Sequence, residues 1–246
     1  MADDDEPAQV GLSILRARDV DVAVILRRGP TKQVRMIRWD MRRDDFVRGQ
    51  WVAARIYAYA SRITPDGKYV DYSGMRRGDT WRAVARPPYF TPLAVWGGIT
   101  GQPGGWQSTT DAALPSWLVP SWRVENRNDW VAAEDAPFRE RIPHATIRDL
   151  DLQRRAATPV MDGYASWTDR HSHVFRLFDR RAEAAHDLGT ADWADWHPSG
   201  DLAIARDGLI TRIPIERRAP GSSRVIADFT GDTFEKLPPP PDATRW

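Results

Sequence analysis

The sequence predicts an all-β fold of short antiparallel strands, and three observations support this prediction. Short runs rich in Val, Ile and aromatic residues recur along the chain, as in residues 34–40, 46–51 and 81–86. Turn-forming residues such as Gly, Pro and Asp interrupt these runs at intervals typical of tight turns between strands. One ordered set of such strands and turns occurs twice, once in each half of the chain. No motif in either copy identifies a reaction or a ligand.

The bulk composition is that of a globular protein. The chain has 246 residues, of which 41% are hydrophobic and 28% charged, so it is long enough for one large all-β domain. Its formal net charge is +1, so no global field attracts nucleic acid. The absence of cysteine excludes disulfides, thiolate metal ligands and a thiol nucleophile. The acidic start is unlike a signal peptide and the aliphatic run 22–26 is too short to span a bilayer, so we expect a cytoplasmic protein without a membrane partner.

The first copy of the repeated set begins after two N-terminal strands, at residues 11–15 and 20–26. Thr64-Pro65-Asp66-Gly67 has Pro at its second and Gly at its fourth position, which predicts a type I turn within a hairpin. The strands expected in this copy are residues 34–39, 46–51, 59–63, 68–73, 81–86 and 89–96.

The second copy repeats the same order near the C-terminus. Residues 173–179 form an arginine-bearing strand that ends in an aromatic residue and Asp, as residues 34–40 do. His197-Pro198-Ser199-Gly200 replaces the Thr-Pro-Asp-Gly turn, and the strands expected after it are residues 202–205, 209–215 and 224–229. The aromatic-Asp pairs lie 139 residues apart (179 − 40) and the turns 133 apart (200 − 67).

The two intervals predict the architecture. Three repeats of about 45 residues fit either interval, and this is the size of a four-stranded propeller blade. We therefore predict a β-propeller-like domain of about five blades of short antiparallel strands, with four and six blades left open. In such a propeller the last strand, 224–229, would complete the final blade beside an N-terminal strand and remove two exposed sheet edges.

The repeated set also resembles known propeller repeats. Arg-Trp-Asp and Leu-Phe-Asp at a strand end, followed by a turn, a strand and then x-Pro-(Asp/Ser)-Gly in a hairpin, are similar to WD40 and related TolB-type β-propeller repeats. The resemblance covers residues 20–96 and 171–228, and the Gly-His dipeptide that often begins a WD40 repeat is missing. Residues 49–51, 55–57 and 86–89 resemble segments of a group of uncharacterised bacterial proteins, and this likeness implies no function.

The domain organisation follows from where this pattern holds. Residues 1–9 are expected to form an acidic disordered tail, residues 10–235 a single propeller-like domain, and residues 236–246 a Pro-rich tail in which residues 237–241 are extended polyproline II. Within the domain, residues 97–170 are irregular and rich in Trp, Gly and Pro, so they form either degenerate blades or an insertion. Residues 146–157 are a candidate helix. A sandwich or a two-domain protein with an inserted Trp-rich module is the competing architecture.

Two sets of residues are candidates for chemistry. A propeller glycosidase places an acid and a base or nucleophile in its central funnel, and four carboxylates near predicted strand ends are candidates for these roles. His171 and His173 would share one face of a strand and approach a metal with Asp169 or His186. Turn formation explains Asp66 and Asp207 more simply, and exposed or core positions explain the histidines, so we predict no catalytic residue, no metal site and no cofactor. The four carboxylates are Asp66, Asp192, Asp195 and Asp207.

The twelve tryptophans suggest packing first and binding second. We expect six of them to pack within or between blades, namely Trp39, Trp51, Trp81, Trp96, Trp193 and Trp196. Trp, Tyr and Arg are also enriched in interface hot spots, and four such residues lie in or beside Pro- and Gly-rich loops. We predict these four, Arg86, Tyr89, Trp106 and Trp122, as partner-binding residues.

The leading functional prediction is a non-enzymatic scaffold that binds a protein partner. It rests on fold analogy. The alternative is a glycoside hydrolase or a propeller that binds carbohydrate or another small molecule through carboxylates in the funnel. The sequence leaves the oligomeric state open.

Overall fold

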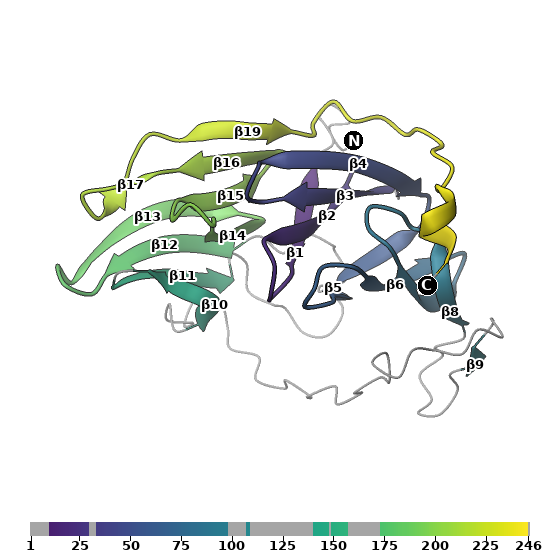
Figure 1. Cartoon of the computed structure of the whole chain (residues 1–246). Coiled ribbons are helices and arrows are strands. Elements are labelled where there is room, and N and C mark those ends of the chain that lie inside the picture. The colour runs from purple at the N-terminus through teal and green to yellow at the C-terminus, as the bar shows by residue number, and fades with distance from the viewer. Residues whose placement is uncertain are drawn as a thin grey trace, which may run out of the picture.

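The structure, a computed structural model, describes residues 10–29, 33–97, 107–108, 140–147, 149–156 and 173–245 (Figure 1). These residues form antiparallel β-sheets and one short 3-10 helix, η3 (Pro241–Thr244), which confirms the predicted all-β class. This part of the chain contains no helix that is long and apolar enough to cross a membrane.

Four sheets of four or five strands make up the fold, and each takes its strands in sequence order with antiparallel pairing. Sheet A contains β1 (Gly11–Arg16), β2 (Val22–Arg28), β3 (Val34–Asp40) and β4 (Asp45–Val52). Sheet B contains β5 (Arg55–Ile63), β6 (Val70–Arg76), β7 (Asp79–Ala85), β8 (Pro92–Gly97) and β9 (Gln107–Ser108). Sheet C contains β10 (Glu140–Ile147), β11 (Leu150–Ala156), β12 (His173–Asp179) and β13 (Ala184–Ala191). Sheet D contains β14 (Trp193–Trp196), β15 (Leu202–Arg206), β16 (Leu209–Ile213) and β19 (Arg224–Asp228). A small hairpin pairs β17 (Ile215–Glu216) with β18 (Ala219–Pro220).

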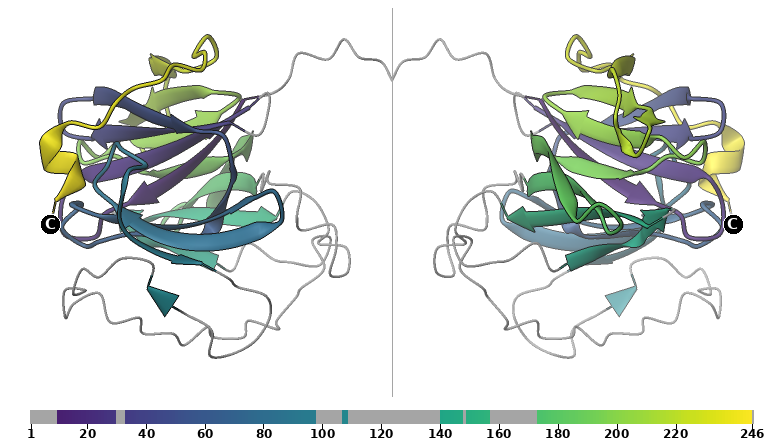
Figure 2. Two further views of the ribbon diagram at one scale, coloured as in Figure 1. Left: turned by 90° about the vertical axis from the view of Figure 1, so that its right-hand side faces the viewer. Right: turned by 90° about the vertical axis from the view of Figure 1, so that its left-hand side faces the viewer.

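The sheets stack face to face in the succession C, D, A, B, because their central strands are apolar on both faces (Figure 2). Side chains alternate between the two faces of a strand, so a strand buried on both sides is a continuous apolar run. In β2, Ala23 and Ile25 face sheet D, whereas Val24 and Leu26 face sheet B. In β15, Ala203 and Ala205 face sheet A, whereas the alternate residues face sheet C. The described residues form this succession of four sheets and no closed ring.

The internal repeat crosses the boundary between neighbouring sheets. The first copy supplies β3 and β4 of sheet A and then β5 to β8 of sheet B; the second supplies β12 and β13 of sheet C and then all of sheet D. The aromatic-Asp pair ends the third strand of a sheet, where the Asp side chain accepts hydrogen bonds from two backbone N–H groups of the next turn. Asp40 accepts from Arg42 and Arg43, and Asp179 accepts from Arg181 and Ala182.

The second feature of the repeat is the hairpin between the first two strands of a sheet. Its turn carries the hydrogen bond from Gly67 N to Thr64 O (2.9 Å) in sheet B and from Gly200 N to His197 O (2.9 Å) in sheet D. Both glycines have positive φ, 72° and 89°, which glycine adopts without the strain of a Cβ atom. The predicted hairpins are therefore confirmed.

Two expectations are corrected, and one strand was not expected. The described residues of the range 146–157 do not form a helix, because residues up to Ile147 belong to β10 and Leu150–Ala156 form β11, which pairs along its whole length with β12. The last strand, β19, pairs with β16, and none of the described N-terminal strands pairs with it. The short strand β14 was not expected, because its four residues follow β13 after a single residue.

Candidate functional site

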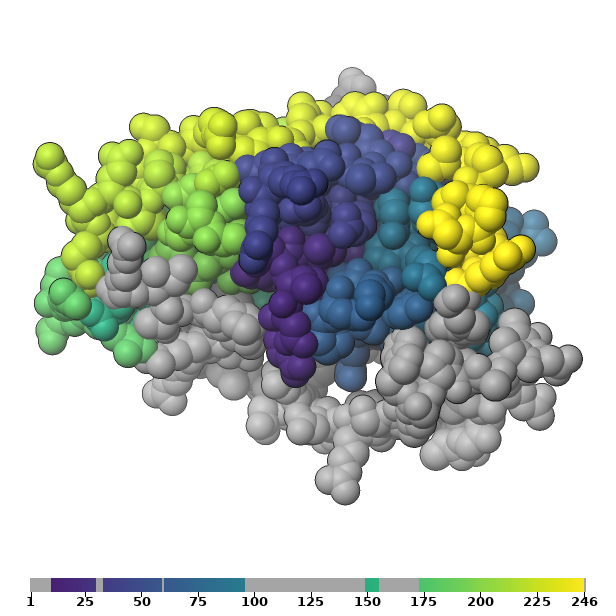
Figure 3. Space-filling model, viewed as in Figure 1, coloured from purple at the N-terminus to yellow at the C-terminus, as the bar shows by residue number. Residues whose placement is uncertain are grey.

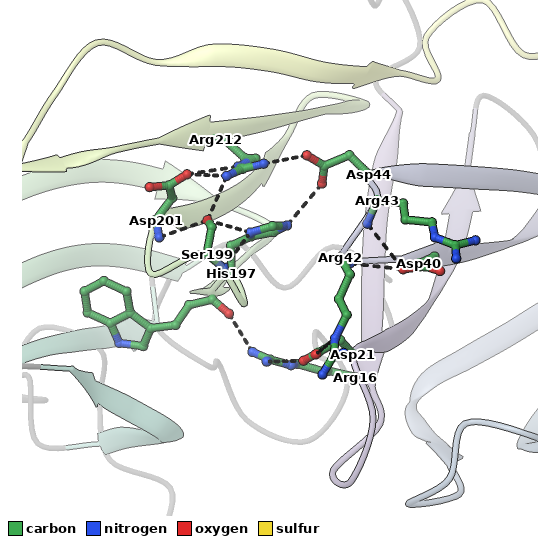
Figure 4. A network of polar contacts seen from close by, with 11 residues as sticks. Arg16, Asp21, Asp40, Arg42, Arg43, Asp44, His197, Ser199, Asp201 and Arg212 are labelled. Atoms are coloured by element: carbon green, nitrogen blue, oxygen red, sulfur yellow. Dashed lines mark hydrogen bonds and ion pairs between the residues drawn. The ribbon is translucent and has the colours of Figure 1, made fainter.

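The contact between sheets A and D contains a polar cluster, which we call the seam cluster: Asp44, His197, Ser199, Asp201 and Arg212 (Figure 4). His197 is buried, Asp44, Asp201 and Arg212 are partly buried, and Ser199 is exposed. Arg212 on β16 donates to Asp44 Oδ2 (2.7 Å), to Asp201 and to Ser199 Oγ (2.7 Å). The two ring nitrogens of His197 lie 2.8 Å from Ser199 Oγ and 3.1 Å from Asp44 Oδ1. Asp44 comes from the β3–β4 turn, where it has φ 52°, and the other four residues come from sheet D.

The electrostatics of this cluster keep His197 neutral. Burial lowers the pKa of His197, and the neighbouring Arg212 lowers it further, whereas Asp44 acts in the opposite direction. A carboxylate only accepts hydrogen bonds, so Nε2 carries the proton and donates to Asp44. Nδ1 is then the acceptor for both the Ser199 hydroxyl and the Ser199 N–H (3.1 Å).

The residue types are those of a nucleophile, a base and an orienting acid, but their contacts hold a turn. Ser199 and His197 belong to one tight turn, and the imidazole is only 3% exposed. Its acceptor nitrogen is shared by two groups of Ser199, so it is not presented to a substrate. What the cluster does in this structure is fasten the β14–β15 hairpin of sheet D to the β3–β4 turn of sheet A.

The two candidate carboxylates that lie at or in β14 also join sheets A and D. Asp192 Oδ2 accepts from the backbone N of Leu12 (3.1 Å). Asp195, which lies within β14, accepts from Arg16 Nη1 (2.8 Å) and from Trp196 N (2.7 Å). Arg16 also donates to Trp196 O (2.6 Å).

The other two candidate carboxylates lie in turns. Asp66 accepts from Thr64 Oγ1 (2.7 Å) and Lys68 N (3.1 Å), and the hydrogen bond from Thr64 is the main cause that lowers the pKa of Asp66. Asp207 has φ 50° in the β15–β16 turn. The hydrolase alternative therefore stays a prediction, with all four carboxylates in structural positions.

The histidines predicted as possible ligands are partly outside the described residues. His171 and Asp169 lie outside them. His173 pairs with Ala191, whereas His186 pairs with Leu177 four residues further along β12, which separates the two histidines by about 13 Å. Among the described residues no group of three or more His, Cys, Asp or Glu side chains is placed to hold a metal ion.

The chain after β19 forms a second candidate site. Residues 229–245, which we call the strap, leave sheet D, run along sheet A and end beside β8 of sheet B (Figure 1, Figure 3). Three arginines of sheet A hold the first part. Arg27 donates to Phe229 O (3.1 Å), while Arg35 and Arg48 both bind Asp232, at 3.0 and 3.2 Å. Phe229 itself is completely buried.

Fewer contacts hold the second part of the strap, residues 233–245. Gln50 Nε2 donates to Leu237 O (2.9 Å), Arg86 Nε donates to Arg245 O (2.9 Å), and the ring of Phe234 lies 6.1 Å from that of Trp51. We call these three residues, Gln50, Trp51 and Arg86, the strap surface. Gln50 Oε1 meanwhile accepts from Phe90 N and from two groups of Thr91, so one amide joins sheet A, sheet B and the strap.

The predicted partner-binding residues are only partly placed. Arg86 binds the strap, and its guanidinium also lies 4.8 Å from the ring of Tyr69. Tyr89 lies three residues later, and its backbone N–H donates to Arg86 O (2.9 Å), which closes a turn between the two residues. Trp106 and Trp122 lie outside the described residues, so the grouping of all four stays a prediction.

The tryptophans expected in packing are mostly found there. Trp39 and Trp196 are buried. Trp81 packs against the apolar cluster between sheets A and B, and Trp193 packs against the one between sheets A and D. Trp51 lies instead beside the strap, with Arg27 and Arg35 at 5.3 and 5.5 Å from its ring. The sixth, Trp96, has a side chain outside the described part.

Sequence reasoning did not single out Gln50, Asp44, Arg212 or Asp232. Each is an ordinary surface-type residue whose partner lies far away in the sequence, 187 residues away for Gln50 and Leu237. Only Gly49-Gln50-Trp51, noted for a resemblance, drew attention to this stretch.

Comparisons with known proteins identify no family. No protein-family model and no curated protein matches the chain. Among solved structures, the tricorn protease is similar with 13% identity and a TM-score of 0.28, over 87% of this chain and 22% of that one. A Bacteroides fragilis protein assigned as a 6-phosphogluconolactonase is similar with 10% identity and a TM-score of 0.19, over 91% of this chain and 56% of that one. This chain thus spans less than two thirds of either structure, and similarities this low carry no argument about function.

Proposed function

We propose that this chain is a propeller of about five TolB-type blades that acts as a non-enzymatic scaffold for a protein partner. The spacing of the sheets supports the blade number. The first strands of sheets A and B begin 44 residues apart (55 − 11), and those of C and D begin 53 apart (193 − 140). Those of B and C begin 85 apart (140 − 55), which is close to two such intervals.

One observation supports binding rather than catalysis. The strap surface already holds a segment of the chain, extended at Pro240 and followed by the 3-10 helix η3, and it does so through the main-chain carbonyls of Leu237 and Arg245. Contacts of this kind recognise a peptide backbone, which is how many protein-binding domains engage extended partners. Asp192 and Asp195, in contrast, are bound to backbone N–H groups and to Arg16.

The test is capture with a matched pair of variants. Tagged full-length protein is crosslinked in a lysate of its own host as wild type, as the Arg86→Ala/Tyr89→Ala variant and as Arg224→Ala, an exposed control on β19. A partner retained by the wild type and by the control but lost from the double variant is the expected result. Equal capture by all three proteins, or no captured protein, would overturn the proposal.

A further inference from the structure

We propose that the strap surface binds an extended, proline-containing peptide of a partner protein, and that residues 233–245 occupy this surface in competition with that peptide. The inference rests on the proposed function and adds to it the class of ligand and a means of regulation. It follows from three observations: the strap is held through its backbone carbonyls, its second part is held less firmly than its first, and the Trp51 indole N–H has no described acceptor.

The strap surface recognises backbone rather than side chains. Gln50 and Arg86 donate to carbonyl oxygens of Leu237 and Arg245, and every residue carries such an oxygen. Between these two contacts lie four consecutive prolines, residues 238–241. Pro240 has φ −70° and ψ 160°, the polyproline II conformation that proline adopts before binding, so little conformational freedom is lost on docking. Proline also has no N–H that docking would leave unpaired.

The two parts of the strap differ in how firmly they are held. Residues 229–232 contain the buried Phe229, and Asp232 forms ion pairs with Arg35 and Arg48. Residues 233–236 are all exposed, and the Phe234 side chain is 49% exposed although its ring lies beside Trp51. Beyond them, the buried residue of the strap is Ala243, in η3. The second part can therefore leave the surface while the first part stays bound to sheet A.

The present occupant does not satisfy the surface completely. The Nε1 atom of Trp51 is buried, and no described residue accepts a hydrogen bond from it. A buried donor without an acceptor weakens a complex, and an indole N–H beside an aromatic contact is well suited to a peptide carbonyl. A partner peptide that places a carbonyl against Trp51 gains a hydrogen bond that the strap does not make.

The experiment measures binding of a labelled synthetic peptide with the sequence of residues 233–245 by fluorescence polarisation. In the wild type the strap competes at a high effective concentration, so the peptide should bind weakly. In full-length protein with Phe234→Ala and Ala243→Asp, which loosen the strap, we expect at least tenfold tighter binding. Adding Gln50→Glu keeps the acceptor for residues 90 and 91 but removes the donor to the peptide carbonyl, so it should weaken peptide binding at least tenfold. A peptide with residues 238–241 changed to alanine should bind at least tenfold more weakly.

A second measurement guards against variants that fold poorly. In the wild-type protein, excess peptide should speed hydrogen exchange of the amides in residues 233–245 and leave the exchange rates of the β19 amides unchanged. Two results would overturn the inference. One is that the peptide neither binds the loosened variant nor speeds hydrogen exchange of the strap, and the other is that Gln50→Glu does not weaken peptide binding. A partner captured through Arg86 and Tyr89 under those conditions would leave the proposed function standing and remove only the peptide proposal.

Discussion

The ion pairs of Asp232 give the sharpest test of how sheet A holds the chain that follows sheet D. Asp232 binds Arg35 at 3.0 Å and Arg48 at 3.2 Å, and the three side chains differ in exposure: 11% for Asp232, 10% for Arg35 and 43% for Arg48. One carboxylate therefore has a buried partner and an exposed one. Removing one member of a buried pair costs about 3–5 kcal/mol, whereas an exposed pair contributes about 1 kcal/mol or less.

The expected magnitudes follow from what each variant leaves behind. Asp232→Ala leaves the Arg35 guanidinium buried with Gly49 O (3.2 Å) as its remaining hydrogen-bond acceptor, so we expect the lower end of that range, about 3 kcal/mol. Arg48→Met loses an exposed pair and the contact of its guanidinium with the Phe229 ring (5.1 Å), for about 1 kcal/mol in total. For a chain of this size, about 3 kcal/mol lowers the melting temperature by roughly 6–12 °C.

Urea unfolding of the single and double variants measures the two couplings separately. The cycle of Arg35→Met with Asp232→Ala should give a coupling free energy of about 2 kcal/mol or more, and the cycle of Arg48→Met with Asp232→Ala less than about 1 kcal/mol. Equal couplings, or an Asp232→Ala cost below about 0.5 kcal/mol, would refute the assignment of Arg35 as the buried partner.

Three further predictions concern other parts of the fold. The pKa of His197 is lowered in the folded state relative to about 6.5 in the unfolded chain, so the free energy of unfolding should fall as pH drops below about 6.5, by at most about 1.4 kcal/mol per pH unit. Urea titrations at pH 7.5, 6.5 and 5.5 measure this slope, and His197→Gln should remove it. Gly49→Ala places a Cβ atom 1.9 Å from Pro88 O, so it should cost about 3 kcal/mol, whereas Gly11→Ala, which meets nothing within 4 Å, should change stability little; similar costs would contradict the close approach. Asp40→Ala should cost about 1–2 kcal/mol through the two turn hydrogen bonds, and Asp40→Asn, which keeps an acceptor, clearly less, as thermal unfolding would show.

The fold was predictable where its signals are local. Thr64-Pro65-Asp66-Gly67 and its counterpart at His197 mark hairpins because Pro fixes φ and Gly alone adopts positive φ without strain, whatever surrounds them. The aromatic-Asp pairs were recognisable for the same reason, since each Asp binds the turn that follows it. The helix expected over residues 146–157 was wrong because their apolar residues are few, and pairing with β12, not periodicity, makes residues 150–156 a strand.

The candidate site was not predictable in this way. Arg27 and Phe229 are 202 residues apart, and nothing near either one indicates the other. Arg86 was selected because it adjoins prolines in a loop, but the structure shows that its nearest ligand is Arg245 of the same chain. Asp192 and Asp195 lie near strand ends, as predicted, but their contacts with Leu12 N and Arg16 of β1 could not be read from the sequence.

The contact of sheet A with sheet D also sets an order of events for folding. Residues 12–41 of this contact are synthesised long before residues 203–229, so the face of sheet A that carries Ile25 and Trp39 has no cover until the chain is nearly complete. Closing a loop of 202 residues costs about 3 kcal/mol more entropy than closing a hairpin of ten, and contacts at such separations form slowly. Sheets A and B can fold as neighbours during this interval. During this interval the uncovered apolar face of sheet A exposes the nascent chain to aggregation, and a chaperone would protect it there.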